Sequence, residues 1–184
     1  MPHFSSDKYQ IEIESDPTYR FGSADNVNDY ETIHFPESKY RLSSVYGIKI
    51  FKDEVLLKGA VIGADGGSTG IFENSLIIEP DRIIICCSNS VFCLSIPDLN
   101  LLWKTKVDGI TCFEIFKHLD NYIIHGEMEI SMLDKNGIIL WQQSGRDIFV
   151  AQTNDGFIVT ENYILVKDWE NNQYKFDFTG QIIT

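Results

Sequence analysis

Apolar residues along this chain fall in short runs separated by turn-forming residues. The runs are rich in Ile, Val, Phe and Tyr, as in YGIKIF (46–51), SLIIEP (75–80), RIIICCS (82–88), NYIIHGE (121–127) and NYILVK (162–167). Runs of this length and composition predict strands, whereas a helix would show apolar residues at i, i+3, i+4 and i+7. The best helix candidate, TCFEIFKHL (111–119), also alternates as a strand. We therefore predict an all-β chain.

One turn-and-strand pattern recurs along the sequence. LDKNGIILW (133–141) places Asp134, Asn136 and Gly137 in a turn and then runs as an apolar strand to Trp141. An Asn-Gly pair supplies the positive φ values of a tight hairpin. Echoes of the pattern are SIPDLNLLW (95–103), FDFTGQII (176–183) and, more faintly, IFKDEVLLK (50–58). The copies recur every ~40 to 45 residues with about four strands per unit, as in a propeller blade.

The repeated turns also carry a family resemblance. DLNLLW, DKNGIILW and, more weakly, DFTGQII resemble the ends of quinoprotein-like β-propeller blades, over about residues 70 to 184. The resemblance implies blades of four antiparallel strands, but full propellers of that class have more blades than this chain supplies. We expect about four repeated antiparallel β-meanders, propeller-like, either a small closed ring or an open stack, with an N-terminal arm. No cofactor-binding residue of the family maps onto this sequence, and we expect no cofactor.

The first forty residues differ from the rest. Residues 1–40 are predicted to form an acidic arm that packs on or joins the first repeat, and residues 41–184 to form the repeated β-meander domain. YQIEIES and YETIHF could supply strands to the first repeat, and SDPTYRFGSADNVNDYE is predicted to be a loop. Apolar residues in the arm need burial, which favours a packed arm; they are Tyr9, Ile11, Ile13, Tyr19 and Phe21.

The net charge of the chain limits the classes of partner that it can bind. Lys and Arg total 15 against 27 Asp and Glu, which gives a net charge of −12 over 184 residues. Such a charge disfavours direct binding to nucleic acid or to an anionic membrane, and it suits a basic protein partner or simply keeps the protein in solution. The N-terminus lacks the pattern of a secretory signal, and no apolar run has transmembrane length. The four cysteines lie inside apolar strands, which predicts buried thiols and a cytoplasmic location.

The most conspicuous loop is GADGGSTG (63–70). Glycine-rich turns expose backbone N–H groups that bind anions, but a phosphate loop needs a Lys and a following helix, and both are missing from this stretch. The loop is either a connection between repeats or a contact surface. As a contact surface it would use Asp65, Gly66, Gly67, Ser68 and Thr69.

Other candidate chemistry is sparse. The histidines lack metal-site spacing, and we expect no metal site. His125, Glu127 and Glu129 alternate along one strand, either as an acid/base cluster or as a solvated sheet face. No nucleophile-elbow motif occurs. We expect the three tryptophans to pack between repeats rather than to form a ligand cage; they are Trp103, Trp141 and Trp169.

These observations favour a non-catalytic module that binds another protein. One concrete version neutralises a basic protein, as small acidic bacterial immunity proteins do, without binding nucleic acid or membrane itself. A first alternative is a small-molecule or glycan-processing enzyme that uses the loop face of the repeats. A second is a structural homo-oligomer in which an open sheet edge pairs with another copy.

Overall fold

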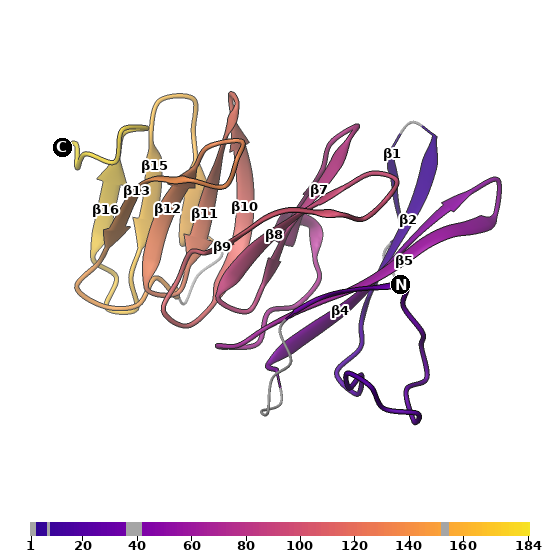
Figure 1. The fold of residues 1–184 in the computed structure, drawn as a ribbon. Coiled ribbons are helices and arrows are strands. Elements are labelled where there is room, and N and C mark those ends of the chain that lie inside the picture. The colour runs from indigo at the N-terminus through magenta and orange to yellow at the C-terminus, as the bar shows by residue number, and fades with distance from the viewer. Residues whose placement is uncertain (1–2, 7, 36–41, 152–154) are drawn as a thin grey trace.

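Four β-sheets, antiparallel apart from one parallel pair in the first, stand side by side in a row (Figure 1). The computed structural model describes residues 3–6, 8–35, 42–151 and 155–184. The sheet nearest the N-terminus lies at one end of the row and the sheet nearest the C-terminus at the other, so the sheets do not close into a ring (Figure 1). The predicted all-β architecture of repeated meanders is confirmed. The domain boundary predicted between residues 40 and 41 lies outside the described residues.

The first sheet contains strands from before, within and after a long excursion of the chain, which lies between residues 15 and 44. Its order is β1 (His3–Ser6), β2 (Tyr9–Ser15), β4 (Ser44–Lys52), β5 (Val55–Ala64) and β3 (Thr32–His34). The stretch YQIEIES forms β2, and part of YETIHF forms β3. β3 pairs in parallel with β5, whereas the other neighbours in this sheet are antiparallel.

The second and third sheets are regular meanders of four strands. The 3-10 turn η1 (Glu73–Ser75) leads into the second sheet, which holds β6 (Leu76–Ile78), β7 (Arg82–Cys87), β8 (Ser90–Ser95) and β9 (Leu101–Lys106). The third holds β10 (Cys112–His118), β11 (Asn121–Gly126), β12 (Glu129–Leu133) and β13 (Ile139–Ser144). TCFEIFKHL is therefore a strand, as its alternation predicts.

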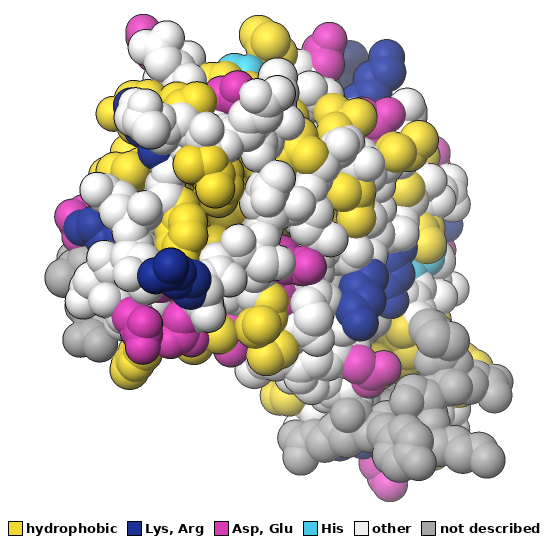
Figure 2. Space-filling view, turned by 90° about the vertical axis from the view of Figure 1, so that its left-hand side faces the viewer, with side chains coloured by type: hydrophobic (Ala, Val, Ile, Leu, Met, Phe, Trp, Pro, Cys, Tyr) yellow, Lys and Arg dark blue, Asp and Glu magenta, His cyan; other side chains and the backbone are white. Residues whose placement is uncertain are grey.

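The fourth sheet is shorter. It contains β14 (Phe157–Val159), β15 (Ile164–Lys167) and β16 (Gln173–Phe176), and an isolated bridge joins Phe176 to Ile182. Hydrophobic side chains gather in a hollow on the face at this end of the row (Figure 2). Ile158 on β14 is 39% exposed.

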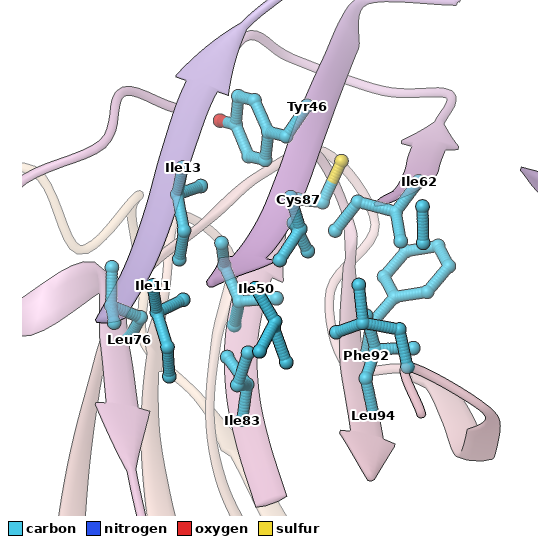
Figure 3. Close-up of a cluster of buried hydrophobic side chains, with 14 of the residues drawn as sticks. Ile11, Ile13, Tyr46, Ile50, Ile62, Leu76, Ile83, Cys87, Phe92 and Leu94 are labelled. Carbon is cyan, nitrogen blue, oxygen red and sulfur yellow. The ribbon is translucent and has the colours of Figure 1, made fainter. Parts of the chain in front are cut away.

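Each pair of neighbouring sheets buries an apolar layer, which strand alternation makes possible. On β7, Ile83 and Cys87 face the first sheet, where they meet Ile11, Ile50 and Ile62 (Figure 3). Ile84 and Cys86 face the third sheet. Burial of all four cysteines, predicted from their apolar strands, is confirmed. A third layer, between the third and fourth sheets, contains Ile123, Ile130, Met132, Phe149, Ile164, Val166 and Phe176.

The N-terminal excursion covers the outer face of the first sheet. Tyr19 and Tyr30 pack there against Val45 and Val61. Buried Asp16 fixes the excursion, because its carboxylate accepts hydrogen bonds of 3.0 Å from the Tyr30 hydroxyl and from the Asn28 amide. Tyr19 is buried as expected, but Phe21 is not.

Phe21 is 52% exposed, which corrects the expectation that it needs burial. It lies in the loop beyond the tyrosine layer, where the sheet no longer reaches it.

The two tryptophans at equivalent repeat positions lock each sheet to the next one. Trp103 on β9 donates its indole N–H to the carbonyl of Lys135 at 3.1 Å, and Trp141 on β13 donates to the carbonyl of Phe178 at 3.0 Å. Both acceptors follow the Asp that opens the outer turn of the next sheet. The residue two positions after each tryptophan adds a second bond, from Thr105 to the carbonyl of Gly137 at 2.6 Å and from Gln143 to that of Gly180 at 3.0 Å.

The glycine of each outer turn is required by this lock. Gly137 and Gly180 have φ values of +79° and +83°, and a Cβ on either would come within 2.5 or 2.7 Å of the tryptophan ring of the preceding sheet. The Asp134 carboxylate holds the first of these turns by accepting the N–H groups of Asn136 and Ile138, both at 2.8 Å. The turn thus spans four residues with Gly137 alone at positive φ, instead of the predicted tight Asn-Gly hairpin.

The interface between the first and second sheets is bridged by a histidine, which contacts an outer-turn carbonyl as Thr105 and Gln143 do at the other two interfaces. His34 on β3 places Nε2 2.6 Å from the carbonyl of Leu99. Leu99 has a φ of +53° and lies four residues before Trp103, as Gly137 lies four before Trp141. All three interfaces therefore use the carbonyl of the left-handed residue in the next outer turn.

Trp169 does not share this role. It lies in the turn between β15 and β16 and is 48% exposed, so the expectation that it packs between repeats is wrong.

Replacing the locking tryptophan should cost stability that replacing Trp169 does not. We expect Trp141→Ala to lower the free energy of unfolding by about 2–4 kcal/mol, because it removes a half-buried ring and leaves the Phe178 carbonyl without its donor. Trp169→Ala is the matched control and should change it by less than about 0.5 kcal/mol. Urea denaturation followed by circular dichroism measures both, and equal losses would contradict the lock.

Candidate functional site

A pocket of about 300 Å³ opens between the third and fourth sheets. Its walls are mainly aromatic and aliphatic, and one polar pair, Glu114 and His125, lies among them. The apolar lining comes from β10, β14 and the connection between the third and fourth sheets, and includes Phe113, Phe149, Val150 and Phe157.

A β-bulge places the polar pair in the pocket. Cys112 pairs with Gly126, but the next pair along the ladder is Glu114 with His125, so Phe113 is the extra residue on β10. Glu114 and His125 are thus direct cross-strand neighbours, whose side chains lie close on one face. The bulge adds Phe113 to the pocket wall.

Both nitrogens of His125 are engaged by acceptors. Nδ1 lies 2.8 Å from Oε2 of Glu114, and Nε2 lies 2.9 Å from the carbonyl oxygen of Phe149. Both partners are acceptors, so a ring with one N–H donates to one of them and a ring with two N–H groups donates to both. The ring also stacks on Phe157 at 4.3 Å and meets Phe113 edge-on at 5.5 Å.

The Glu114 carboxylate is stabilised in its charged form. Burial raises its pKa, but the hydrogen bond and charge of His125, aided by the Asn74 amide at 3.3 Å, outweigh that effect, and the pKa is lowered overall. The pair is therefore a fixed ionic clamp inside an apolar site.

This arrangement suits binding better than proton transfer. A general base needs a nitrogen or oxygen within reach of a substrate proton. Both His125 nitrogens already have protein partners, so the pair leaves no imidazole nitrogen for a substrate. The clamp instead holds the pocket walls from β10, β11 and the segment at Phe149 in one geometry.

Of the two alternatives for His125, Glu127 and Glu129, an acid/base cluster along one strand is not formed. β11 ends at Gly126, so the strand alternation that would align the three residues stops there. Glu129 belongs to β12, where burial and the charge of Asp108 raise its pKa.

The predicted contact loop (Asp65–Thr69) is held by hydrogen bonds to residues of the first and third sheets and of the segment between the second and third. Thr69 is buried; its hydroxyl donates to the Cys112 carbonyl at 3.1 Å, and its carbonyl accepts the Tyr46 hydroxyl at 2.5 Å. The N–H of Gly67 donates to the Ile110 carbonyl at 2.8 Å. A Cβ on Gly67 would collide with the Thr111 hydroxyl, which explains the glycine by close packing.

Part of the loop still faces outward. Asp65, Gly66 and Ser68 are exposed. Thr69 contacts Cys112, the residue before the pocket residue Phe113, although no residue of the loop lines the pocket itself. A binding role for the loop stays a prediction, with Thr69 as its structural anchor.

Comparison with known proteins shows similarity in fold to solved structures but not in sequence. No family model matches the chain, and no curated protein matches its sequence. Among solved structures, BamB from Moraxella catarrhalis, a β-propeller, matches with a TM-score of 0.53 at 12% identity, covering 77% of this chain and 45% of BamB. The fold is β-propeller-like.

Designed propeller proteins support the same conclusion. The computationally designed Ika8 protein matches with a TM-score of 0.54 at 10% identity over 99% of this chain and 59% of its own. The designed Ika4 protein matches with a TM-score of 0.51 at 9% identity over 63% of this chain and 76% of its own. This propeller-like chain spans about half the length of BamB and Ika8. Within the described residues, no helix has the length and apolar character needed to cross a bilayer.

The Glu114–His125 pair was missed in the sequence, although a signal for it exists. His118 pairs with Asn121 across a two-residue connection, and that register, carried back along both strands, sets Glu114 opposite His125. Following the hairpin register, rather than alternation along one strand, would have found the pair.

Loss of the Thr69 hydroxyl should lower the stability of the fold. We expect Thr69→Val to lower the free energy of unfolding by about 1–2 kcal/mol, because the Cys112 carbonyl loses a buried donor. Ser68→Ala, at the exposed neighbour, is the control and should be neutral. Thermal unfolding compares the two, and a neutral Thr69→Val would show that the loop is not held as described.

The ionic clamp should make stability depend on pH in the acid range. Because the folded-state pKa of Glu114 is lowered from its ordinary value of 4.5, its contribution is present above that value and is lost as pH falls through the folded pKa. Wild type should exceed Glu114→Gln in unfolding free energy by about 1 kcal/mol at neutral pH, and the gap should close as pH falls below the folded-state pKa of Glu114. Denaturation at several pH values measures the gap, with exposed Glu161→Gln as control; a gap independent of pH would rule out the ionic clamp.

Proposed function

We propose that this propeller-like chain is a non-catalytic protein-binding module whose pocket takes an apolar side chain from a basic partner protein. The observation that supports this most is the Glu114–His125 clamp: it satisfies the polar groups of the pocket internally and leaves an aromatic surface open.

The pocket suits a protruding apolar anchor. Its volume of about 300 Å³ is at the small end of ligand sites, large enough for one bulky side chain. Phe113 and Phe157 offer ring faces and edges for an aromatic or aliphatic group. Anchors of this kind supply most of the binding energy at protein interfaces, provided that they fill a desolvated pocket.

Acidic residues in the segments that support the pocket favour basic residues beside that anchor. Glu73 precedes Asn74, whose amide donates to Glu114, and the carbonyl of Glu127 accepts the N–H of Phe149 at 2.6 Å. Two carboxylates thus belong to segments that hold the pocket, and the whole chain carries a net charge of −12. Such a field speeds association with a basic protein and excludes an acidic one.

The exposed part of the contact loop extends this surface. Asp65 and Ser68 are exposed in the loop that Thr69 anchors to Cys112, and in this proposal they contribute further contacts to the partner. The finer version of the proposal, neutralisation of a toxic basic protein in the cytoplasm, rests on acidity, size and the closed clamp. A processing enzyme fits less well, since His125 lacks a free nitrogen.

A peptide selection tests the proposal without knowledge of the partner. From a phage-displayed random peptide library, we expect wild type to enrich peptides with a large apolar residue flanked by Lys or Arg. Phe113→Ala should weaken binding of a selected peptide by at least tenfold, because the anchor loses its aromatic wall. Calorimetry measures the affinities, which should also fall as salt rises.

Phe21→Ala is the matched control, because it removes the same kind of ring from an exposed loop of the N-terminal excursion, outside the pocket. It should bind the peptide as wild type does. Enrichment of acidic peptides, or equal binding by Phe113→Ala, would refute the proposal.

A further inference from the structure

The outer edges of the second and third sheets are open. β9 and β13 are the last strands of their sheets, and among the described residues no backbone hydrogen bond links either outer edge to another segment. An open edge presents unpaired N–H and C=O groups and is a template for another strand. In the first sheet the corresponding edge, that of β5, is covered by β3, which shows that this architecture accepts an added strand.

The two open edges differ in charge. Trp103 and Trp141 hold equivalent positions, so Lys104 and Lys106 of β9 correspond to Gln142 and Ser144 of β13. Lysines on an edge strand oppose pairing with another edge. β13 reads ILWQQS and carries no charge.

The flank of β13 is also apolar. Ile138 and Leu140 are 62% and 52% exposed. Leu140 is the extra residue of a bulge, because Leu133 pairs with Ile139 and Met132 with Trp141. The bulge leaves Trp141 to Ser144 as a regular four-residue run next to exposed aliphatic side chains.

We infer that β13 pairs along its outer edge with β13 of a second copy of this chain, antiparallel about a two-fold axis. Two-fold pairing sets the side chains of one β13 opposite those of the other. Because none of them is charged, the pair suffers no like-charge repulsion across the strands, whereas β9 paired with itself would oppose lysines. The result is one continuous sheet through both copies, on a surface separate from the pocket.

Solution mass tests this inference directly. Light scattering after size exclusion should give twice 21.1 kDa at about 100 μM, falling toward 21.1 kDa on dilution by mass action. Ser144→Lys restores the charge that β9 carries at Lys106. It should shift the protein to 21.1 kDa at every concentration without loss of thermal stability, because Glu129 lies directly across the ladder from residue 144.

Leu140→Lys and Leu102→Lys make a matched pair, one at the bulge of each open edge. The first should abolish the doubled mass and the second should keep it. A wild type that stays at 21.1 kDa at about 100 μM would overturn the inference, as would a Ser144→Lys protein that keeps the doubled mass. Loss of the doubled mass in Leu102→Lys alone would assign the interface to β9 instead.

Discussion

The indole ring that closes on the outer turn of the next sheet is the contact on which this architecture depends. Sheets can bury apolar faces against one another in many relative positions, because hydrophobic contact has no direction. The bonds from Trp103 and Trp141 do have direction: each fixes one sheet against a particular carbonyl of the next. The glycine beneath each ring is required for the same reason, since a Cβ would displace the indole.

The sequence repeat predicted the sheets in which this tryptophan contact recurs. Trp103 and Trp141 follow similar turns, so the second and third sheets could be predicted strand by strand. Parallel pairing of β3 with β5 could not, because the segment around Thr32 has no second copy for comparison and a three-residue strand has a weak pattern. Trp169 misled the prediction, since it lies in the turn between β15 and β16 and not on a strand.

The candidate site shows a different limit of sequence reading. Glu114 and His125 are on neighbouring strands, and their contact depends on the register of a hairpin and on one bulge residue, Phe113. Alternation along a single strand pointed instead to Glu127 and Glu129. Of the contact loop, the glycines proved to serve packing, and Thr69 proved to be buried, because a loop that joins sheets must satisfy its own backbone groups.

Amide and indole hydrogen exchange followed by NMR tests the central contact most directly, because the chain has three indole N–H groups in three settings. The structure predicts slow exchange for the indole protons of Trp103 and Trp141, which are bonded across sheet interfaces, and fast exchange for the exposed ring of Trp169. Equally fast exchange of all three would contradict the lock, and with it the account of how the sheets are held in place.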